Sequence, residues 1–536
     1  MDPVRLEIFR HRFSAIAEEM GVALCRSAFS PNIKERRDYS CALFDSQGRM
    51  VEQASHLPVH LGSMPMSVQS ALESMPAWEP GDMVLLNDPY RGGTHLPDLT
   101  LVAPVFSAAA DRLVGFVANR AHHADVGGMA PGSLSTAREI FQEGLRLPPL
   151  RICRAGEVDE HLLRLILANV RTPEERRGDL MAQVAANYTG QRRLSELLRK
   201  EGVELTCEAM VSLLEYSGRM TRAMIREIPD GVYSFTDYLD DDGISEEPVR
   251  IAVQITIAGE KAAVDFTGSD PQCQGPVNAV LAVTVAAVFY VFRSLSDPRL
   301  PSNSGVLSPI EIRAPRGSVV NAVYPAAVGA GNTETSQRIV DVLLGALAQA
   351  IAERIPAASC GSMSSLVVGG VDPQTGEPFT YYETIAGGMG ARPDRDGLDG
   401  VHTHMTNTMN TPVEALELSF PLRVLRYGLR RGSGGAGSRR GGDGIIREIE
   451  CLTPATVSIL SERRKFAPYG LQGGYPGKPG ENLLTREGRV EPLPGKVTFC
   501  TARGDRISIS TPGGGGYGTP AKRGYPRSGC GSGGAP

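Results

Sequence analysis

Lysine, paired cysteines and long apolar runs are scarce in this sequence. Only seven of the 55 basic residues among its 536 positions are lysine, so a catalytic lysine has few candidates. The nine cysteines form no C-x-x-C pair, which is typical of reduced thiols in the cytoplasm. The longest nearly apolar run, 280–292, has 13 residues and is too short to span a bilayer.

A basic excess is missing as well. The 55 basic and 60 acidic residues give a net charge of −5, which argues against nucleic-acid binding because nothing is left over to neutralise phosphates. Residues 1–13 are charged throughout and contain no apolar segment, so no signal peptide is expected. We therefore expect a cytoplasmic protein that binds neither nucleic acid nor membrane.

The length and the residue pattern predict an α+β protein with mixed sheets and a helical section, in two or three domains. The 61 glycines and 38 prolines predict many turns. We expect an N-terminal domain over 1–230 with metal-binding loops and the helical section, a central α+β domain over 231–386 and a glycine-rich β domain over 387–520. Residues 521–536 are expected to form a disordered tail.

Apolar periodicity predicts the main elements. Helices are expected over 2–29, 157–230, 280–294 and 335–352. Strands are expected over 39–44, 83–86, 99–106, 113–118, 249–257, 261–266, 456–460 and 496–501. The strands 249–257 and 261–266 are expected to pair as a hairpin across the turn at Gly259. The strands before residue 120 are separated by loops that carry most of the polar residues with chemical potential.

Two of these loops contain the pattern H-x-x-D. The first pairs His95 with Asp98, and the second pairs His122 with Asp125. Imidazole and carboxylate together suit a divalent cation such as Zn, Mn or Fe, and two loops on neighbouring strands can converge on one ion. Asp38, just before another strand, offers a further carboxylate. The alternative is that these are hydrogen-bonded structural residues.

A glycine-rich segment at 432–437 has the spacing G-x-G-x-x-G. A dinucleotide site requires this motif to open a helix, and the residues that follow are poor helix formers. Flanking arginines, including Arg439 and Arg440, would allow the loop to hold an anion; the alternative is a tight turn with a solvated arginine face. No P-loop and no G-x-S-x-G nucleophile motif is present in the sequence.

A third polar segment, 399–417, contains His404 and Asn407. It is unusually rich in polar groups for a stretch that precedes a strand. Two interpretations stay open: it lines a substrate cleft, or it forms a structural network of turns.

Long motifs in a fixed order give this chain a resemblance to a known family. They are RRDYSCALFD, HLPVHLGSM, NDPYRGGTHLPD, NRAHHADVGG, EIFQEGLRLPP, DFTGSDPQ, GNTETSQRI, YYETIAGGMGA, HMTNTMNTPVEALE, GGAGSRRGGDG and TPGGGGYG, and they run from residue 36 to 518. The sequence resembles the hydantoinase B family, whose relatives include the C-terminal half of 5-oxoprolinase and a subunit of acetone and acetophenone carboxylases.

The resemblance implies an ATP-dependent hydrolase that opens a hydantoin, 5-oxoproline or a related lactam. An A-type partner subunit with an actin-like ATPase fold would use the ATP to phosphorylate the substrate carbonyl, and this chain would process the activated product at a Zn²⁺ or Mn²⁺ ion. Transferred onto this sequence, the family's ligand motifs fall on Asp38, His95, Asp98 and His122.

Further roles follow from the same resemblance. His123 and Asp125 would act in catalysis by orienting the ligands or the solvent. Apart from the resemblance, the residues themselves make His404 and Asn407, or Arg439 and Arg440, candidates to grip the substrate or its phosphate.

Three alternatives stay open. The chain would be a subunit of an ATP-dependent ketone carboxylase, a non-catalytic scaffold for the A-type subunit, or a metal hydrolase that needs neither partner nor ATP.

Overall fold

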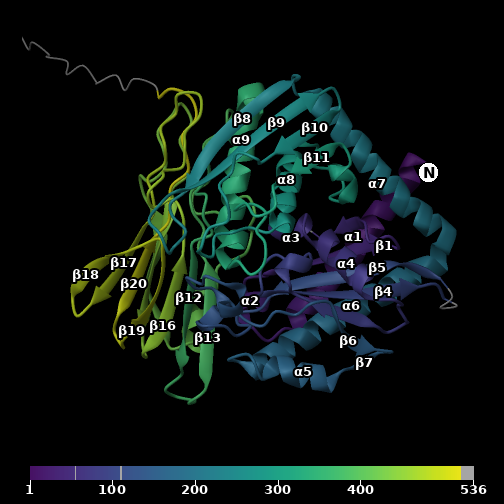
Figure 1. Cartoon of the computed structure of the whole chain (residues 1–536), viewed down its shortest axis with the longest axis horizontal. Coiled ribbons are helices and arrows are strands. Elements are labelled where there is room, and N and C mark those ends of the chain that lie inside the picture. Colours follow the sequence, from purple (N-terminus) through teal and green to yellow (C-terminus); the bar gives the residue numbers. More distant parts are fainter. Residues whose placement is uncertain (55, 109–111, 521–536) are drawn as a thin grey trace, which may run out of the picture.

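The computed structural model describes residues 1–54, 56–108 and 112–520. Its strands form four sheets, and helices pack around these sheets (Figure 1). The α+β fold class is therefore confirmed. The expected tail over 521–536 lies outside the described residues. No helix in the described part is both long and apolar enough to cross a membrane.

The N-terminal part contains a seven-stranded antiparallel sheet in the order β2-β1-β5-β4-β3-β6-β7. Its strands are β1 (Tyr39–Asp45), β2 (Met50–Gln53), β3 (Met83–Leu86), β4 (Asp98–Phe106), β5 (Leu113–His122), β6 (Leu150–Arg154) and β7 (Glu157–Val158). The helices of this part are α1 (Pro3–Ser27), α2 (Pro31–Lys34), α3 (Pro58–Leu61), α4 (Met64–Ser74), α5 (Glu160–Leu167), α6 (Pro173–Glu201) and α7 (Val203–Arg226).

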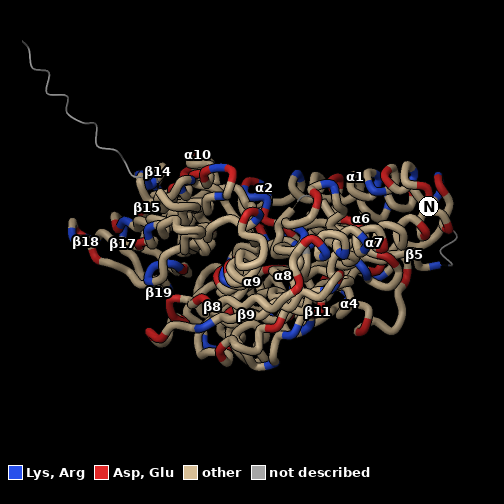
Figure 2. Tube along the Cα trace, turned by 90° about the horizontal axis from the view of Figure 1, so that it is seen from above, with Lys and Arg blue, Asp and Glu red and all other residues tan. Residues whose placement is uncertain are grey.

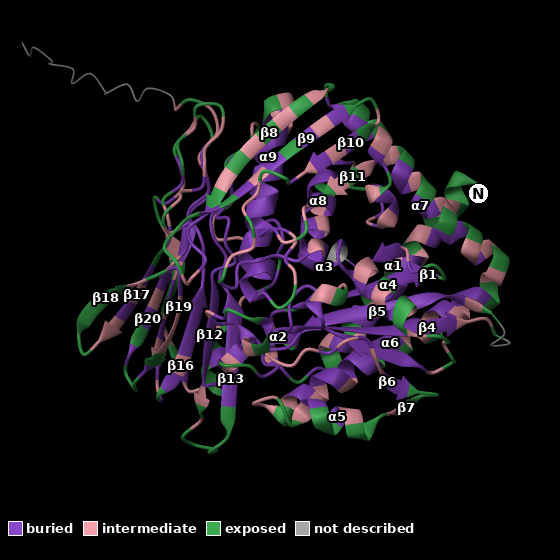
Figure 3. Cartoon of the chain, in the orientation of Figure 1, coloured by how far each residue is buried: buried purple, intermediate pink, exposed green. Residues whose placement is uncertain are grey.

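Both faces of this sheet are covered, which explains why its central strands are apolar along nearly their whole length. Leu43 and Val117 point into the large core that also contains α1 and α6. Their neighbours Phe44 and Phe116 point to the opposite face, where α4 packs. Figure 3 shows β1, β4 and β5 as almost continuously buried. Successive side chains along each strand thus point to opposite faces of the sheet and pack into two separate cores.

The middle of the chain forms a four-stranded sheet in the order β11-β10-β9-β8, with α9 packed against β8 and β9. The elements are β8 (Gly231–Leu239), β9 (Val249–Ala258), β10 (Lys261–Asp265), α8 (Leu281–Leu295), β11 (Ile310–Arg313) and α9 (Ser336–Ile351). The expected hairpin of β9 and β10 forms across Gly259, whose φ of +60° favours glycine. A π-helical turn, Gly331–Thr335, leads into α9.

The C-terminal part is a sandwich of two sheets, in the orders β13-β12-β16-β19 and β14-β15-β20-β17-β18, around a core of its own. Its elements are β12 (Ser365–Val371), β13 (Pro378–Thr384), α10 (Val413–Ser419), β14 (Leu422–Arg430), β15 (Gly444–Cys451), β16 (Ala455–Leu460), β17 (Glu481–Arg486), β18 (Arg489–Leu493), β19 (Lys496–Thr501) and β20 (Arg506–Ser510). β12 pairs with β16, so a boundary between residues 386 and 387 would divide one sheet. The division into domains stays a prediction.

Charges of both signs are interspersed along the chain. In the view of Figure 2, basic and acidic positions alternate over the N-terminal helices and over the C-terminal sheets. The expected helices over 280–294 and 335–352 are confirmed as α8 and α9, and the first helix is confirmed as α1. The expected helical section 157–230 begins with the short strand β7 and continues as α5 to α7.

Candidate metal centre

Backbone pairing brings the two H-x-x-D segments together at one end of the seven-stranded sheet. Asp98 begins β4, His122 ends β5, and the two residues are direct partners in the antiparallel ladder. His95 lies three positions before Asp98, in the loop that enters β4. Because ladder partners lie about 4.5–5.5 Å apart at Cα, strand register brings Asp98 and His122 together, and the short loop before β4 adds His95.

The ligand atoms of this cluster converge. His95 Nε2 lies 3.1 Å from Asp98 Oδ1 and 3.2 Å from His122 Nδ1. His122 Nδ1 lies 3.1 Å from the same carboxylate oxygen. Ligand atoms about 2.0–2.1 Å from a tetrahedral metal are about 3.3 Å from one another. The three atoms therefore have the mutual spacing of one coordination shell.

Neighbouring groups fix the orientation of His95. Its Nδ1 lies 3.2 Å from the carbonyl oxygen of Gly329, so the ring presents Nε2 to the cluster. Glu143 accepts a hydrogen bond from the Gly329 N–H at 2.7 Å and holds this segment in place. A hydrogen bond of this kind sets the tautomer of a metal-binding histidine.

Later segments of the chain close the cluster. Asn332, in the π-helical turn, places its Nδ2 3.1 Å from His95 Nε2, and its buried Oδ1 has no hydrogen-bond partner. Tyr382 of β13 stacks on the His122 ring at a centroid distance of 4.5 Å. As a result, the side chains of His95, Asp98 and His122 are almost completely buried.

The electrostatics suit a cation. Burial raises the pKa of Asp98, but the charges of His95 and His60 outweigh it and hold the pKa of this carboxyl well below its usual value. Burial lowers the pKa of His122 and favours its neutral form, which is the form that binds metals. Two imidazoles and a carboxylate are a donor set that fits Zn²⁺, Mn²⁺ or Fe²⁺.

Asp38 lies beside the cluster. Its backbone carbonyl accepts a hydrogen bond from the His122 N–H at 3.0 Å, and one carboxylate oxygen lies 3.6 Å from a guanidinium nitrogen of Arg36. Burial raises the pKa of the Asp38 carboxyl. The converging group within the described residues consists of His95, Asp98 and His122, so Asp38 as a fourth ligand stays a prediction.

His60 is a neighbour of the cluster that the sequence reasoning did not assign. Its Nε2 lies 3.4 Å from Asp98 Oδ2, and its Nδ1 lies 2.9 Å from Ser40 Oγ. The signal was the repeated histidine in HLPVH, which places His60 on the short helix α3. Asn332 had no such signal, because its motif GNTETSQRI contains no histidine and no H-x-x-D spacing.

His123 and Asp125 lie in hydrogen-bond networks of their own. His123 Nε2 lies 2.9 Å from Oε1 of Gln183 on α6. Asp125 accepts hydrogen bonds from the N–H of Gly127 at 3.0 Å and from the Arg171 side chain at 2.8 Å. These contacts hold the loop after β5 against the start of α6. Their catalytic assignment stays a prediction.

The residues predicted to contact substrate or phosphate lie in two places. His404 and Asn407 line a cavity of about 430 Å³. Arg440 lies on the glycine-rich loop and pairs with Asp399 at 2.9 Å, while the backbone of Arg439 pairs with Tyr517.

The glycines of that loop serve backbone packing. A Cβ at Gly434 would lie 1.9 Å from the carbonyl oxygen of Gly441, so only glycine fits there. The segment 432–443 begins no helix, as expected from the residues after the motif. This arrangement agrees with the interpretation of the segment as tight turns.

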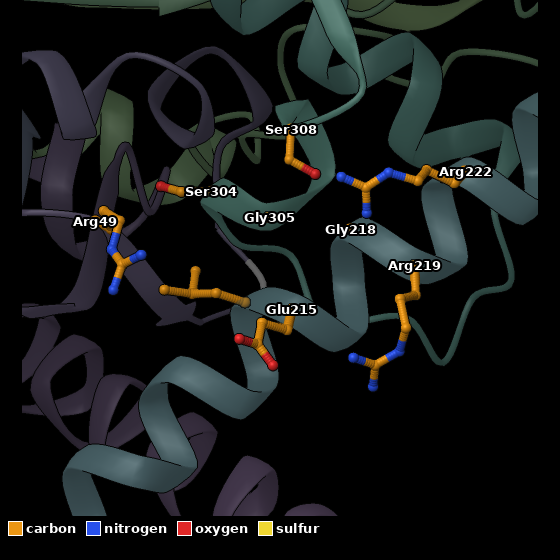
Figure 4. A pocket seen from close by; sticks show the side chains of 9 residues that line it. Arg49, Glu215, Gly218, Arg219, Arg222, Ser304, Gly305 and Ser308 are labelled. Atoms are coloured by element: carbon orange, nitrogen blue, oxygen red, sulfur yellow. The ribbon is translucent and has the colours of Figure 1, made fainter. Parts of the chain in front are cut away.

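A separate cavity of about 360 Å³ lies between α7 and the segment 304–308 (Figure 4). Arg49, Arg219 and Arg222 surround it together with Glu215. Arg49 is paired with Asp45 across one turn. None of the residues that line this cavity was predicted to carry function.

Comparisons with known proteins identify the family of this chain. The sequence matches the hydantoinase B/oxoprolinase family over residues 2–520. An uncharacterised protein of Methanocaldococcus jannaschii is 43% identical over 98% of this chain and 92% of its own length. The 5-oxoprolinase 1 of Arabidopsis thaliana is 40% identical over 97% of this chain, but the chain spans only 42% of that protein.

Two solved structures have the same fold. The ATP-dependent caprolactamase of Pseudomonas jessenii superimposes with a TM-score of 0.90 at 29% identity, over 97% of this chain and 91% of that one. The nucleotide-free acetone carboxylase has a TM-score of 0.90 at 19% identity, over 98% and 76% of the two chains, and at that identity it indicates the fold alone. Because the family match covers nearly the whole described chain, this protein belongs to the hydantoinase B/oxoprolinase family.

Proposed function

We propose that this chain is the metal-dependent B-type component of an ATP-dependent enzyme that hydrolyses a small cyclic amide. The observation that carries the proposal is the convergence of His95, Asp98 and His122 on one point, with ligand atoms 3.1–3.2 Å apart. The relatives support the substrate class, since one is named a 5-oxoprolinase and another an ATP-dependent caprolactamase. The substrate of this chain is a hydantoin, 5-oxoproline or a related lactam.

The ATP-dependent step belongs to a partner. The chain has no P-loop, and it spans only 42% of the Arabidopsis 5-oxoprolinase, so more than half of that protein corresponds to nothing here. We assign the missing part to an A-type subunit with an actin-like ATPase fold, which would phosphorylate the amide oxygen and make it a good leaving group. We propose a cytoplasmic location for the complex, which the proposed use of ATP and the absence of C-x-x-C pairs from the sequence support.

The residues of the cluster would hold a divalent ion, Zn²⁺ or Mn²⁺. When bound, such an ion lowers the pKa of a water molecule so that hydroxide is available at neutral pH. His95 is held by Gly329, and Thr94 donates to Asp98 Oδ2 at 2.6 Å, so two of the three ligands are oriented in advance. Tyr382 covers one face of His122 and excludes bulk water from that side.

Metal content tests the proposal. We expect about one divalent ion per purified chain by mass spectrometry, and loss of that ion in His95→Ala and His122→Ala with folding retained by circular dichroism. His161→Ala, on the surface of α5, is the control and should retain the metal. Turnover of hydantoin, 5-oxoproline and caprolactam is then measured with ATP and the A-type subunit.

Each alternative predicts a different result. A folded chain that takes up no metal even after reconstitution would be a scaffold for the A-type subunit. Turnover by this chain alone, without ATP, would indicate a stand-alone hydrolase. Incorporation of bicarbonate into a ketone by the same complex would indicate a carboxylase, an alternative that rests on shared fold at 19% identity.

A further inference from the structure

The cavity lined by His404 and Asn407 lies next to the candidate metal centre. It has a volume of about 430 Å³, within the range of about 300–1,000 Å³ typical of small-molecule sites. Leu295 of α8, Leu344 of α9 and Leu398 contribute apolar walls. Half of its polar side chains come from the loop 401–407, which includes His404 and Asn407.

His404 is the most unusual residue of this cavity. It is more than nine-tenths buried, and its Nε2 has no hydrogen-bond partner. The nearest groups are Asp341 Oδ1 at 3.6 Å from Nε2 and the Tyr290 hydroxyl at 3.5 Å from Nδ1. Nε2 therefore has an ion-pair contact with Asp341 that is longer than a hydrogen bond, and the imidazole keeps hydrogen-bonding capacity that a ligand in the cavity would use.

The backbone at His404 is strained as well. Its φ is +58°, in the left-handed region that residues other than glycine rarely adopt. Backbone of this kind is energetically unfavourable and is concentrated at binding and active sites. The surrounding contacts hold it there: Val59 N–H donates to the Met405 carbonyl at 3.1 Å, and the Gln337 side chain donates to the Thr403 carbonyl at 3.1 Å.

The charges of the cavity favour an uncharged ligand. Both arginines that line it already have acidic partners: Arg354 lies 3.0 Å from Glu227, and Arg392 lies 3.6 Å from Asp394. A phosphate or carboxylate site is typically built from guanidinium groups free to bind in two places at once. Imidazole, hydroxyl and amide groups instead match the donor and acceptor of an amide.

One short helix connects the cavity to the metal centre. Pro58 of α3 lines the cavity, and His60, two positions further, lies 3.4 Å from Asp98. Since an α-helix rises about 1.5 Å per residue, the cavity begins within one helical turn of the cluster's neighbour.

We infer that this cavity is a binding subsite for the uncharged ring of a small cyclic amide, with His404 and Asn407 contacting the amide group and the leucine walls contacting the ring. The substrate class rests on the proposed function; the location and the residues rest on the cavity itself. The subsite is separate from the side chains that would hold the metal.

Binding of caprolactam and hydantoin to the full chain tests this inference by isothermal titration calorimetry. His404→Asn removes the imidazole but keeps a residue that tolerates positive φ, and we expect it to weaken binding of both rings about tenfold or more. His161→Asn, on the surface of α5, is the matched control and should bind as the wild type does. Circular dichroism checks that both variants fold.

The outcomes separate this inference from the proposed function. Equal affinity of wild type and His404→Asn, or no binding of either ring to the folded chain, overturns the subsite even if the metal and the turnover are found. Loss of ring binding in His122→Ala but not in His404→Asn places the ring at the metal centre and overturns it too. Displacement of the ring by inorganic phosphate would show an anion site and overturns the assignment to an uncharged ring as well. Ring binding that His404→Asn weakens in an EDTA-treated chain supports the subsite even if the chain proves to contain no metal.

Discussion

At the scale of single residues, two adjacent histidines have different surroundings. His122 faces Asp98, whereas His123 faces Gln183 on α6. The strand alternation that ends β5 sends consecutive side chains to opposite sides. Sequence spacing selects His122 because it stands three positions before an aspartate, yet the aspartate that it contacts is Asp98 on the neighbouring strand, and no local spacing shows this.

Glu52 predicts a pH dependence of stability. It is buried on β2, one of its carboxylate oxygens has no partner, and burial raises its pKa from an ordinary 4.5 to about 8. The folded-state pKa lies above that of the unfolded chain, so the carboxyl costs nothing at low pH, where it is protonated in both states. Stability is lost as the pH rises from about 4.5 to about 8.

We therefore expect Glu52→Gln to unfold like the wild type at pH 5 and to be more stable by a few kcal/mol at pH 9. Urea unfolding at the two pH values measures the difference. Glu79→Gln on the surface is the control and should show no such difference. A stability gap for Glu52→Gln that does not grow with pH would contradict this account.

At the scale of elements, the π-helical turn before α9 positions a side chain. Gly331 begins this turn, and a Cβ there would lie 1.9 Å from the carbonyl oxygen of Asn278. The turn places Asn332 against His95. Turns of this kind are frequent at functional sites because they redirect one side chain without ending the helix.

Gly331→Ala should therefore destabilise the fold by about 1–3 kcal/mol and weaken metal binding, since the backbone must move away from Asn278. The two effects are measured by thermal unfolding and by metal titration. Gly428→Ala on β14 is the control, because nothing lies within 4 Å of the Cβ that it adds. Unchanged metal affinity in a destabilised Gly331→Ala variant would mean that the π-helical turn does not contribute to metal binding.

Element identity could be predicted better than element pairing. Regular apolar spacing predicted α1, α8, α9 and the hairpin of β9 and β10, because these depend on local sequence. The pairing of β12 with β16 joins segments about 90 residues apart, and nothing local in either strand encodes it. The same holds for the site: the ligand motifs were visible in the sequence, but Asn332, Tyr382 and Gly329 reach it only through tertiary packing.

At the scale of the whole molecule, a buried ion-pair network joins the middle of the chain to the C-terminal sandwich. Lys496 of β19 lies 3.3 Å from Asp241, just after β8, and also pairs with Glu462. Glu462 in turn lies 3.4 Å from Arg338 on α9. Lys496 and Glu462 are almost completely buried, so neither charge has water as a substitute partner.

Lys496→Met should destabilise the protein by about 3–5 kcal/mol, because it leaves the carboxylate of Glu462 buried without its ammonium partner. Chemical unfolding measures the loss. Lys478→Met, at an exposed position, should change stability little. The double variant Lys496→Met/Glu462→Leu should recover part of the loss; no recovery would mean that the network does not act through this pair.

The chain order of the groups around the metal centre has a consequence for biosynthesis. All three cluster residues are made by residue 122, but Tyr382, which covers His122, follows about 260 residues later. At translation rates of about 5–20 residues per second, the growing chain would carry these ligands uncovered for roughly 10–50 s. If the proposed ion binds, it would be loaded most easily in that interval, and the choice of metal would then depend on which ion is available at the ribosome rather than on exchange in the finished protein.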